Sequence, residues 1–290
     1  MSRPSLSLLN SMAGRDFSAA LERHAEWGIT QLDLKDSIFG KNIADLTETD
    51  AANAAELIGA RRMSVYCLSS SIFASDVEAG RAAFRSKHEP VLDRILDVAR
   101  ILKPTFIRLI SAQTSRRAGI QNSASYLTEN HHWVFEVYGE AIDRISAAGF
   151  KTVIENEIDN QILVNAREIR DFFAIIKRPE KVRFTWDIAN SWQAGAFPTL
   201  AAYHELKPVI GYIHVKGGKS DGQGQALKFA SSLRDAGWPV REILSEAIRD
   251  GVSPVICLNP PHGTAAPGDD LSNLAERDLK FMRDLIDELA

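Results

Sequence analysis

The sequence predicts an α/β protein folded as one (β/α)8 barrel. Short apolar runs alternate with longer amphipathic segments, and this cycle repeats eight times. The 290 residues suit a barrel of this kind, which typically needs about 250 residues. No Ser/Gly-rich linker divides the chain, so we expect a single domain over residues 1–290. An open doubly wound sheet is the alternative, but no Gly-rich phosphate loop follows the first strand.

The predicted strands are short apolar runs that end in polar or charged residues. They span residues 6–11, 29–36, 63–71, 105–111, 151–157, 182–190, 210–219 and 254–259. Amphipathic segments predict helices from 16 or 18 to 27, 47 or 49 to 62, 80 to 102, 126 to 148, 165 to 177, 200 to 206, 227 to 237, 240 to 250 and 271 to 289. Pro90 predicts a break or kink within the third of these helices.

Composition excludes several classes of protein. Hydrophobic residues make up 45% of the chain and charged residues 25%, which is ordinary for a globular protein. The net charge of −4 offers no basic footprint for a nucleic acid. Cys67 and Cys257 stand in apolar runs without CxxC spacing, which favours buried thiols in a reducing compartment. No apolar run of about 18 residues predicts a membrane span, and no secretory signal is evident, so we expect a cytoplasmic protein.

The stretch KTVIENE, residues 151–157, is the first candidate for chemistry. In a (β/α)8 barrel the active site lies at the carboxyl ends of the strands. Glu155 and Glu157 end the fifth strand two positions apart, so their side chains share one face. Two neighbouring carboxylates repel each other unless a cation or a shared proton compensates. The plainer interpretation is that both acids are solvated loop residues.

The next three strands end in further candidate ligands. Asp187 ends the sixth strand, His214 lies on the seventh and Asn259 ends the eighth. If these side chains face the barrel axis, they meet Glu155 at one point. Carboxylates with an imidazole suit a divalent ion such as Mn²⁺, Mg²⁺, Co²⁺ or Zn²⁺. Each residue alone has an ordinary explanation, as a helix cap or a hydrogen-bonded core histidine.

Cationic side chains also follow the strands. Arg108, Lys35, Lys216 and Lys219 are placed to surround the barrel mouth, where they could hold a phosphate, a carboxylate or sugar hydroxyls. Alternatively, Lys35 and Lys216 could neutralise Asp33 and Glu157 in internal ion pairs.

Taken in order, these motifs resemble the xylose isomerase-like TIM barrels, a family of sugar isomerases, epimerases, inosose dehydratases and endonuclease IV. The resemblance runs from Leu6 to the last helix and is carried by VIENE, FTWDIAN and YIHVKGGK. The DGQGQ segment, residues 221–225, resembles a GxG loop of the family. The resemblance implies one divalent metal held by Glu155, Asp187, His214 and the residue at position 259. It also implies a small carbohydrate substrate, and many proteins of this kind are homo-oligomers.

Two departures bear on the mechanism. The family carries a Glu on strand eight in a stretch like SLEPH, whereas this chain reads CLNPPH and has Asn259 there. Asparagine offers a neutral carbonyl ligand but cannot take up a proton. Glu157 stands where the family often has His, which makes it a candidate acid/base; pairing with a Lys or Arg is the alternative. A second proton donor would have to be Lys216, Lys35 or His262.

The function predicted on this basis is metal-dependent isomerisation or epimerisation of a sugar through an enediolate. A metal polarises the substrate carbonyl, and a carboxylate removes the neighbouring proton. A lyase or dehydratase using the same chemistry is the runner-up, favoured by Asn259, and a degenerate sugar-binding barrel is a third reading. DNA repair is disfavoured because Asn190 stands where a His ligand is expected. The resulting assignments are catalytic Glu155, Glu157 and Lys216; substrate-binding Arg108, Lys35 and His262; and metal-binding Glu155, Asp187, His214 and Asn259.

Overall fold

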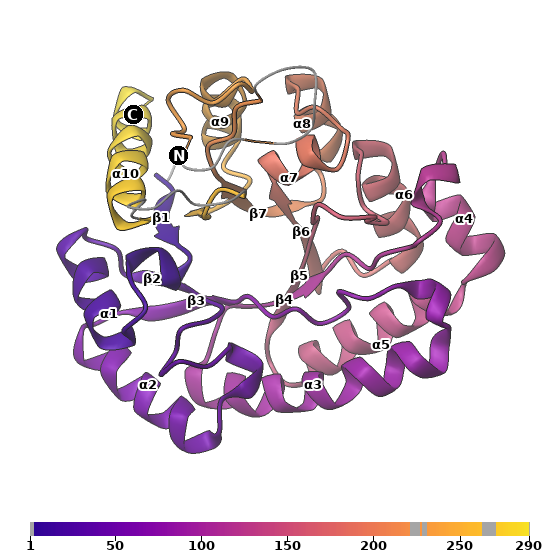
Figure 1. Ribbon diagram of the computed structural model, residues 1–290, viewed down its shortest axis with the longest axis horizontal. Helices are drawn as coiled ribbons and strands as arrows, with labels where there is room; N and C mark the ends of the chain where they lie inside the picture. Colours follow the sequence, from indigo (N-terminus) through magenta and orange to yellow (C-terminus); the bar gives the residue numbers. More distant parts are fainter. Residues whose placement is uncertain (1–2, 221–226, 228–230, 263–270, 290) are drawn as a thin grey trace.

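The computed structural model describes residues 3–220, 227, 231–262 and 271–289. Within these residues, eight parallel strands form one sheet in the order β1-β8-β7-β6-β5-β4-β3-β2. An isolated parallel bridge between Leu9 and Asp33 joins the chain after β1 to β2, so the sheet nearly closes on itself. Helices surround the strands, and the two termini lie close together beside β1 and α10 (Figure 1). This is the predicted (β/α)8 barrel.

The strands agree with the predicted positions and are generally shorter at their carboxyl ends. Their bounds are β1 Ser5–Leu8, β2 Gln31–Leu34, β3 Ser64–Leu68, β4 Phe106–Ile110, β5 Lys151–Glu155, β6 Val182–Asp187, β7 Ile210–Val215 and β8 Val255–Leu258. The polar residues that follow each strand leave the sheet and form the loops at one end of the barrel. A short 3-10 helix, Asn10–Ala13, takes up the end of the first predicted strand.

The helices begin where the sequence supplies caps. Their bounds are α1 Phe17–Glu26, α2 Glu48–Ala60, α3 Arg81–Leu102, α4 Ser123–Asn130, α5 Trp133–Ala147, α6 Ala166–Ile176, α7 Ile188–Gln193, α8 Leu200–Leu206, α9 Val240–Asp250 and α10 Leu271–Glu288. Asp16 accepts a hydrogen bond from the backbone of Ala19 at the start of α1. Thr47 and Asn165 start α2 and α6 with capping boxes.

Four local predictions are wrong. The helix predicted for 126–148 is two helices, α4 and α5, with His131 and His132 between them. The break predicted at Pro90 does not occur, since α3 is continuous. The sixth strand ends at Asp187, because this residue caps α7 and residues 188–190 belong to that helix. The segment predicted as a helix over 227–237 is not helical where it is described, at 227 and 231–237.

Side chains inside the barrel form an apolar layer beneath a polar one. The apolar layer is a cluster of seven buried residues: Tyr66, Cys67, Phe106, Val153, Tyr212, Val255 and Cys257. Two positions farther along their strands, Arg108, Glu155 and His214 form the polar layer. The larger core lies between the sheet and the helices.

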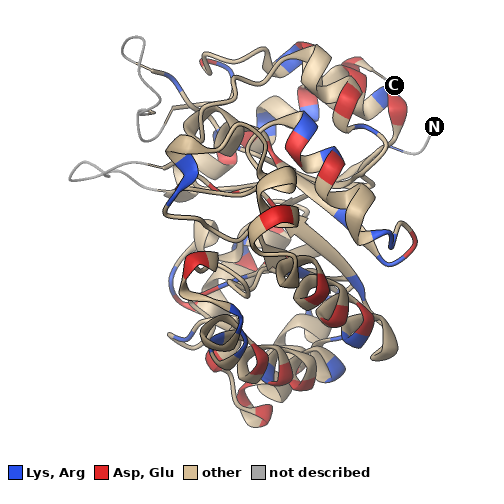
Figure 2. Ribbon diagram, turned by 90° about the vertical axis from the view of Figure 1, so that its right-hand side faces the viewer, with Lys and Arg blue, Asp and Glu red and all other residues tan. Residues whose placement is uncertain are grey.

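The outer surface carries both signs of charge. Acidic and basic residues are interspersed over the helices (Figure 2). Many of them pair in exposed ion pairs, such as Arg85 with Glu140 at 2.7 Å. Among the described helices, none is both long and apolar enough to cross a membrane.

Candidate functional site

The four predicted metal ligands converge at the carboxyl end of the barrel. Strand pairing sets Asp187 beside His214, and His214 beside Cys257, two residues before Asn259. One ligand atom each from Glu155, Asp187 and His214 lies within 4.8 Å of the others. The Asn259 amide nitrogen lies 2.9 Å from His214 Nδ1 and 3.4 Å from Asp187 Oδ2. All four side chains are buried.

The two carboxylate oxygens of Asp187 have different roles, one as a helix cap and one within the candidate site. Oδ1 caps α7 by accepting a hydrogen bond from the backbone of Asn190 at 3.0 Å. Oδ2 faces the barrel axis. The neighbouring Asn156 fixes this position, because its side chain accepts from the Asp187 backbone at 3.0 Å and donates back to it at 2.9 Å. The helix-cap and ligand interpretations of Asp187 are therefore compatible.

Glu155 and His214 form a buried, charged pair. His214 Nδ1 lies 2.8 Å from Glu155 Oε1. Burial alone would lower the pKa of His214, but the negative charge of Glu155 and hydrogen bonding with Asp33 and Glu155 outweigh it and raise the pKa to about 9. Burial would raise the pKa of Glu155, yet His214 and Arg108 together hold it well below its usual range. In the metal-free protein this pair is ionised at neutral pH.

Arg108 lies inside the barrel rather than at its rim. The residue is 2% exposed. The guanidinium forms an ion pair with Glu155 and donates to the backbone oxygens of Ser69 at 3.0 Å and Ser70 at 3.2 Å. These contacts fix Arg108 as the counter-charge of Glu155 and direct it toward protein groups.

Lys216 is also buried, and its partner is Asp187 rather than Glu157. Nζ donates to Asp187 Oδ2 at 2.9 Å and to the Asn190 side-chain oxygen at 2.6 Å. Gly217, the next residue, permits a close crossing of two chain segments, because a Cβ there would lie 1.8 Å from the backbone oxygen of Ser231. The glycines of YIHVKGGK thus allow residue 231 to pack over the end of β7.

The site is balanced in charge without any added ion. Asp33, Glu155 and Asp187 face Arg108, Lys216 and a protonated His214. Two carboxylates, an imidazole nitrogen and an amide are also a donor set that divalent cations take. Reversal of the Asn259 amide would turn its oxygen toward the other ligands. The residues therefore fit a divalent cation, which would compete with the Nδ1 proton of His214 and with the ammonium of Lys216.

Glu157 stands at the edge of this cluster. It is partly buried, and its Oε2 accepts a long hydrogen bond from the Asn190 amide nitrogen at 3.5 Å. Burial and the negative charge of Glu155 raise the pKa of Glu157. No ion pair with a Lys or Arg is formed by Glu157 in the described part of the chain. The predicted pairing with Lys216 is thus replaced by an amide contact.

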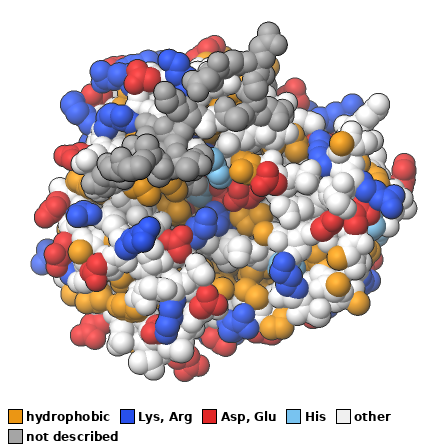
Figure 3. Space-filling view, in the orientation of Figure 1, with side chains coloured by type: hydrophobic (Ala, Val, Ile, Leu, Met, Phe, Trp, Pro, Cys, Tyr) orange, Lys and Arg blue, Asp and Glu red, His pale blue; other side chains and the backbone are white. Residues whose placement is uncertain are grey.

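Lys35 and His262 lie nearer the surface. Both are partly buried. Burial and the positive charges of Lys216 and Lys35 lower the pKa of His262 to about 4, which places its imidazole near the site and keeps it neutral at pH 7. Lys219 is exposed. Acidic, basic and His side chains gather near the centre of the face in Figure 3, and the DGQGQ segment lies outside the described residues.

Three polar residues of the cluster are absent from the catalytic, substrate-binding and metal-binding assignments made from sequence. Asp33 lies between Leu32 and Leu34, whose side chains join the larger core outside the sheet, so regular alternation turns Asp33 toward the barrel interior. The register shift in the β2–β3 pairing leaves Tyr66 of β3 without a paired residue. Asn156 and Asn190 act through hydrogen bonds between segments 34 residues apart. The only sequence signal for them was their position beside Glu155 and after Asp187.

Comparison with known proteins supports the fold. No protein-family model matches the sequence, and no curated protein is significantly similar to it. Among solved structures, a xylose isomerase-like TIM barrel/4-hydroxyphenylpyruvate dioxygenase fusion protein is 10% identical with a TM-score of 0.74; the match covers 99% of this chain and 44% of that protein. A xylose isomerase-like TIM barrel protein from Mycobacterium smegmatis, in complex with magnesium, is 16% identical with a TM-score of 0.70, covering 100% and 98%.

A sugar epimerase has the same architecture. The D-psicose 3-epimerase of Clostridium cellulolyticum H10, solved with D-tagatose, is 13% identical with a TM-score of 0.69, and the match covers 98% of each chain. At these identities the similarity establishes the fold. The resemblance to xylose isomerase-like TIM barrels is confirmed at that level, and similar folds include sugar-processing enzymes and a magnesium complex.

Proposed function

We propose that this protein is a divalent-metal-dependent isomerase or epimerase of a sugar or sugar derivative. The observation that carries the proposal is the convergence of Glu155, Asp187, His214 and Asn259 at the carboxyl end of a xylose isomerase-like barrel. When bound there, a divalent ion would polarise a carbonyl and a neighbouring hydroxyl of the substrate. The protein's own residues must then hold the substrate and move a proton between adjacent carbons.

Glu157 is the proposed base. Glu155 is poorly suited to proton transfer, because Arg108 and His214 engage its oxygens and keep it ionised. Glu157 has no such cation partner among the described side chains, and its raised pKa brings it closer to the working pH of a general base. In this scheme Glu157 removes the proton beside the carbonyl, giving an enediolate, and returns it to the adjacent carbon. The proton of the neighbouring hydroxyl passes to the former carbonyl oxygen, which balances the transfer.

Arg108 is proposed to act through Glu155, and Lys216 is proposed to act on the substrate once it has left Asp187. Arg108 holds Glu155 in a fixed, ionised state from inside the barrel. Lys216 lies between Asp187 and Asn190, and displacement from Asp187 would free its ammonium to face the substrate oxygen. An ammonium in a buried site stabilises negative charge that develops on such an oxygen.

Lys35 and His262 are the proposed substrate contacts at the rim. A neutral imidazole donates one hydrogen bond and accepts another, which suits a sugar hydroxyl. The lowered pKa of His262 keeps it in that neutral form at pH 7. Lys35 adds a cation that could hold a carboxylate or phosphate substituent of the sugar.

Asn259 limits the type of reaction. An amide cannot take up a proton, so the strand-eight side of the substrate lacks the second acid that two-face epimerisation uses. One base, Glu157, is sufficient for transfer between adjacent carbons. It is also sufficient for loss of a β-hydroxyl, so a dehydratase of a keto-polyol or keto-sugar is the second candidate. Asn259 is the residue that favours it.

Solvent deuterium exchange tests the proposal. Protein supplied with Mn²⁺ would be incubated with a panel of keto-sugars in deuterated water and followed by NMR. Isomerisation predicts deuterium at the carbon beside the carbonyl together with an aldose or epimeric product. Dehydration predicts loss of water instead.

Matched variants assign the base. Glu157→Gln should abolish exchange, whereas Glu180→Gln, the same change at an exposed position, should retain it. Exchange that persists in the Glu157 variant would exclude this residue as the base. Sugar binding without exchange in the wild-type protein would favour a non-catalytic, sugar-binding barrel.

A further inference from the structure

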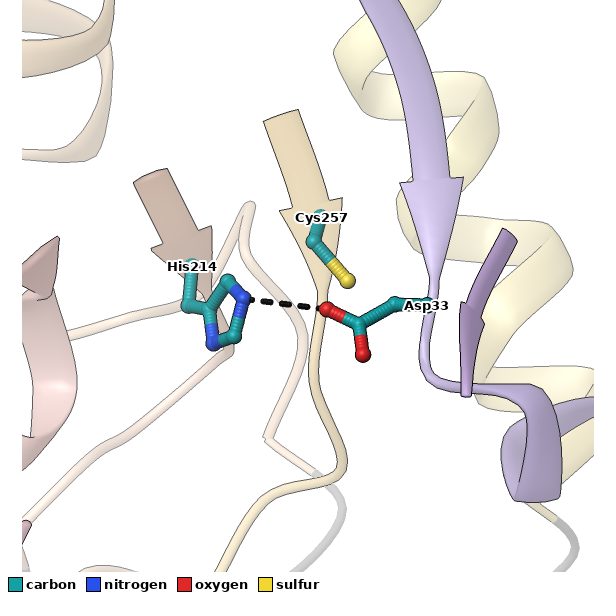
Figure 4. A group of neighbouring side chains, drawn as sticks. All are labelled: Asp33, His214 and Cys257. Carbon is teal, nitrogen blue, oxygen red and sulfur yellow. Dashed lines mark ion pairs between the residues drawn. The ribbon is translucent and has the colours of Figure 1, made fainter. Parts of the chain in front are cut away.

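Asp33 lies beneath the proposed metal site, on the far side of His214. It stands near the end of β2 and is fully buried. Its Oδ2 lies 3.3 Å from His214 Nε2 and accepts a hydrogen bond from the Tyr212 hydroxyl at 3.0 Å. Figure 4 shows the carboxylate and the imidazole directed toward one another, with Cys257 beside them.

The two ring nitrogens of His214 therefore face different surroundings. Nδ1 lies 2.8 Å from Glu155 Oε1 and 2.9 Å from the Asn259 amide, within the proposed ligand set. Nε2 lies 3.3 Å from Asp33 Oδ2 as an ion pair, and it makes no hydrogen bond within the described residues. The distance is slightly longer than that of an ideal hydrogen bond, and Asp33 is the acceptor that Nε2 faces in Figure 4.

The hydrogen bond made by one imidazole nitrogen determines whether the other nitrogen carries a proton or a free lone pair. A carboxylate accepts but does not donate, so Asp33 favours a proton on Nε2. In a neutral imidazole, a proton on Nε2 leaves a lone pair on Nδ1. Carboxylates in this position orient metal-binding histidines and increase their basicity.

We propose that Asp33 is a positioning residue that holds the proton on His214 Nε2 and so reserves Nδ1 for the metal. This inference rests on the proposed metal site. Asp33 does not itself contact that site; it acts through His214. The Tyr212 hydroxyl fixes the carboxylate from the side, and the bridge between Leu9 and Asp33 anchors its backbone where the barrel closes.

A second cation among Asp33, His214 and Cys257 is the competing interpretation, since ligand atoms of these three also lie within 4.8 Å of one another. The hydrogen bonds disfavour it. The Cys257 thiol faces two acceptors, the Leu258 backbone oxygen at 3.5 Å and the Asn259 side-chain oxygen at 3.6 Å.

The first test reads the proton directly. Above about pH 9 the metal-free protein should have lost one of the two ring protons of His214. Nitrogen-15 NMR of the full chain at that pH, with His214 identified by comparison with His214→Asn, should show the remaining proton on Nε2. In Asp33→Asn the amide can donate to Nε2, so an unprotonated Nε2 should become populated. An unprotonated Nε2 in the wild-type protein, or no change in the variant, would overturn the proposal without bearing on metal binding.

The second test measures the effect of Asp33 on metal affinity. Titration with Mn²⁺ should show an affinity lower by about 10- to 100-fold in Asp33→Asn. Tyr212→Phe removes a hydrogen bond from the same Asp33 oxygen and should change the affinity only a few-fold. Equal losses in both variants, with both melting normally, would indicate a purely structural role and contradict the proposal.

The absorption spectrum of bound Co²⁺ distinguishes the proposed metal site from the competing site that includes Cys257. Co²⁺ bound by Glu155, Asp187 and His214 should lack a thiolate charge-transfer band. Such a band, if lost in Cys257→Ser, would overturn the proposal by placing the ion beside Asp33. A protonated Nε2 in a wild-type protein that binds no divalent ion would refute the proposed metal function and the ligand-positioning role, while leaving the Asp33–His214 hydrogen bond in place.

Discussion

Replacement of Glu155 by Gln should destabilise the metal-free protein as well as impair its site. Glu155 is 1% exposed and Arg108 is 2% exposed, so the ion pair between them is shielded from water. Gln retains the size of the side chain and removes its charge. The guanidinium would then stay buried with the backbone oxygens of Ser69 and Ser70 as its remaining partners.

The magnitude follows from this burial. Removal of one partner from a buried ion pair costs about 3–5 kcal/mol. Because two hydrogen bonds to Arg108 remain, we expect a loss near the lower end, about 3 kcal/mol. For a chain of this size that corresponds to a melting temperature lower by about 6–10 °C. His214 would also lose its main source of stabilising charge, so its pKa should fall from about 9.

Urea and thermal unfolding in the presence of a chelator measure this loss. Glu140→Gln is the matched control, since Glu140 forms an exposed ion pair with Arg85 at 2.7 Å. An exposed pair contributes about 0–1 kcal/mol, so the control should unfold almost as the wild-type protein does. A change below about 1 kcal/mol in Glu155→Gln would refute the role of Arg108 and Glu155 as a buried internal pair.

Three further predictions concern charge. Asn259→Glu adds a carboxylate to the ligand set and should tighten Mn²⁺ binding at least about tenfold; unchanged affinity in a titration would place residue 259 away from the ion. Burial raises the pKa of Asp278 to about 6, so the folded state binds its proton more tightly than the unfolded state and stability falls as pH rises from about 4 to about 6. Asp278→Asn should remove that slope and be more stable at pH 7 by up to about 3 kcal/mol in urea unfolding; an unchanged slope would contradict the shift. The pKa of His214 is raised to about 9 by its acidic partners, so the protonated imidazole stabilises the folded state. This stabilisation is complete below about pH 6.5 and is lost as pH rises to about 9. In the presence of chelator, His214→Asn should lack this decline in unfolding free energy.

The sequence was sufficient to predict the order of strands and helices along the chain, because each strand–helix unit carries local signals. Caps such as Asp16, Thr47 and Asn165 begin helices at the predicted positions. The break between α4 and α5 had no comparable signal. His131 and His132 occupy the C-cap of α4 and the N-cap of α5, but histidine is neither a strong helix breaker nor a residue favoured at caps.

Strand alternation placed the inward-facing residues correctly wherever the strands are regular. Glu155, His214 and Lys216 all face the barrel interior, as the two-residue period predicts. Asp33 follows the same period, since Leu32 and Leu34 join the core outside the sheet and Asp33 turns inward. The period could not show that Asp33 reaches His214, because that contact depends on how β2 and β7 are placed around the barrel.

The choice of ion-pair partners could not be read from the sequence. Lys216 reaches Asp187 and Arg108 reaches Glu155, across separations of 29 and 47 residues. The stagger of the strands determines these pairs, because it decides which strand ends lie at the same height in the barrel.

Mn²⁺ binding monitored by electron paramagnetic resonance tests the central claim most directly. The wild-type chain should bind one Mn²⁺. The single variants Glu155→Gln, Asp187→Asn and His214→Asn should each lose that site, while Glu140→Gln should keep it. No saturable binding in the wild-type protein, or full binding in folded samples of all three site variants, would contradict a metal site at the ends of β5, β6 and β7.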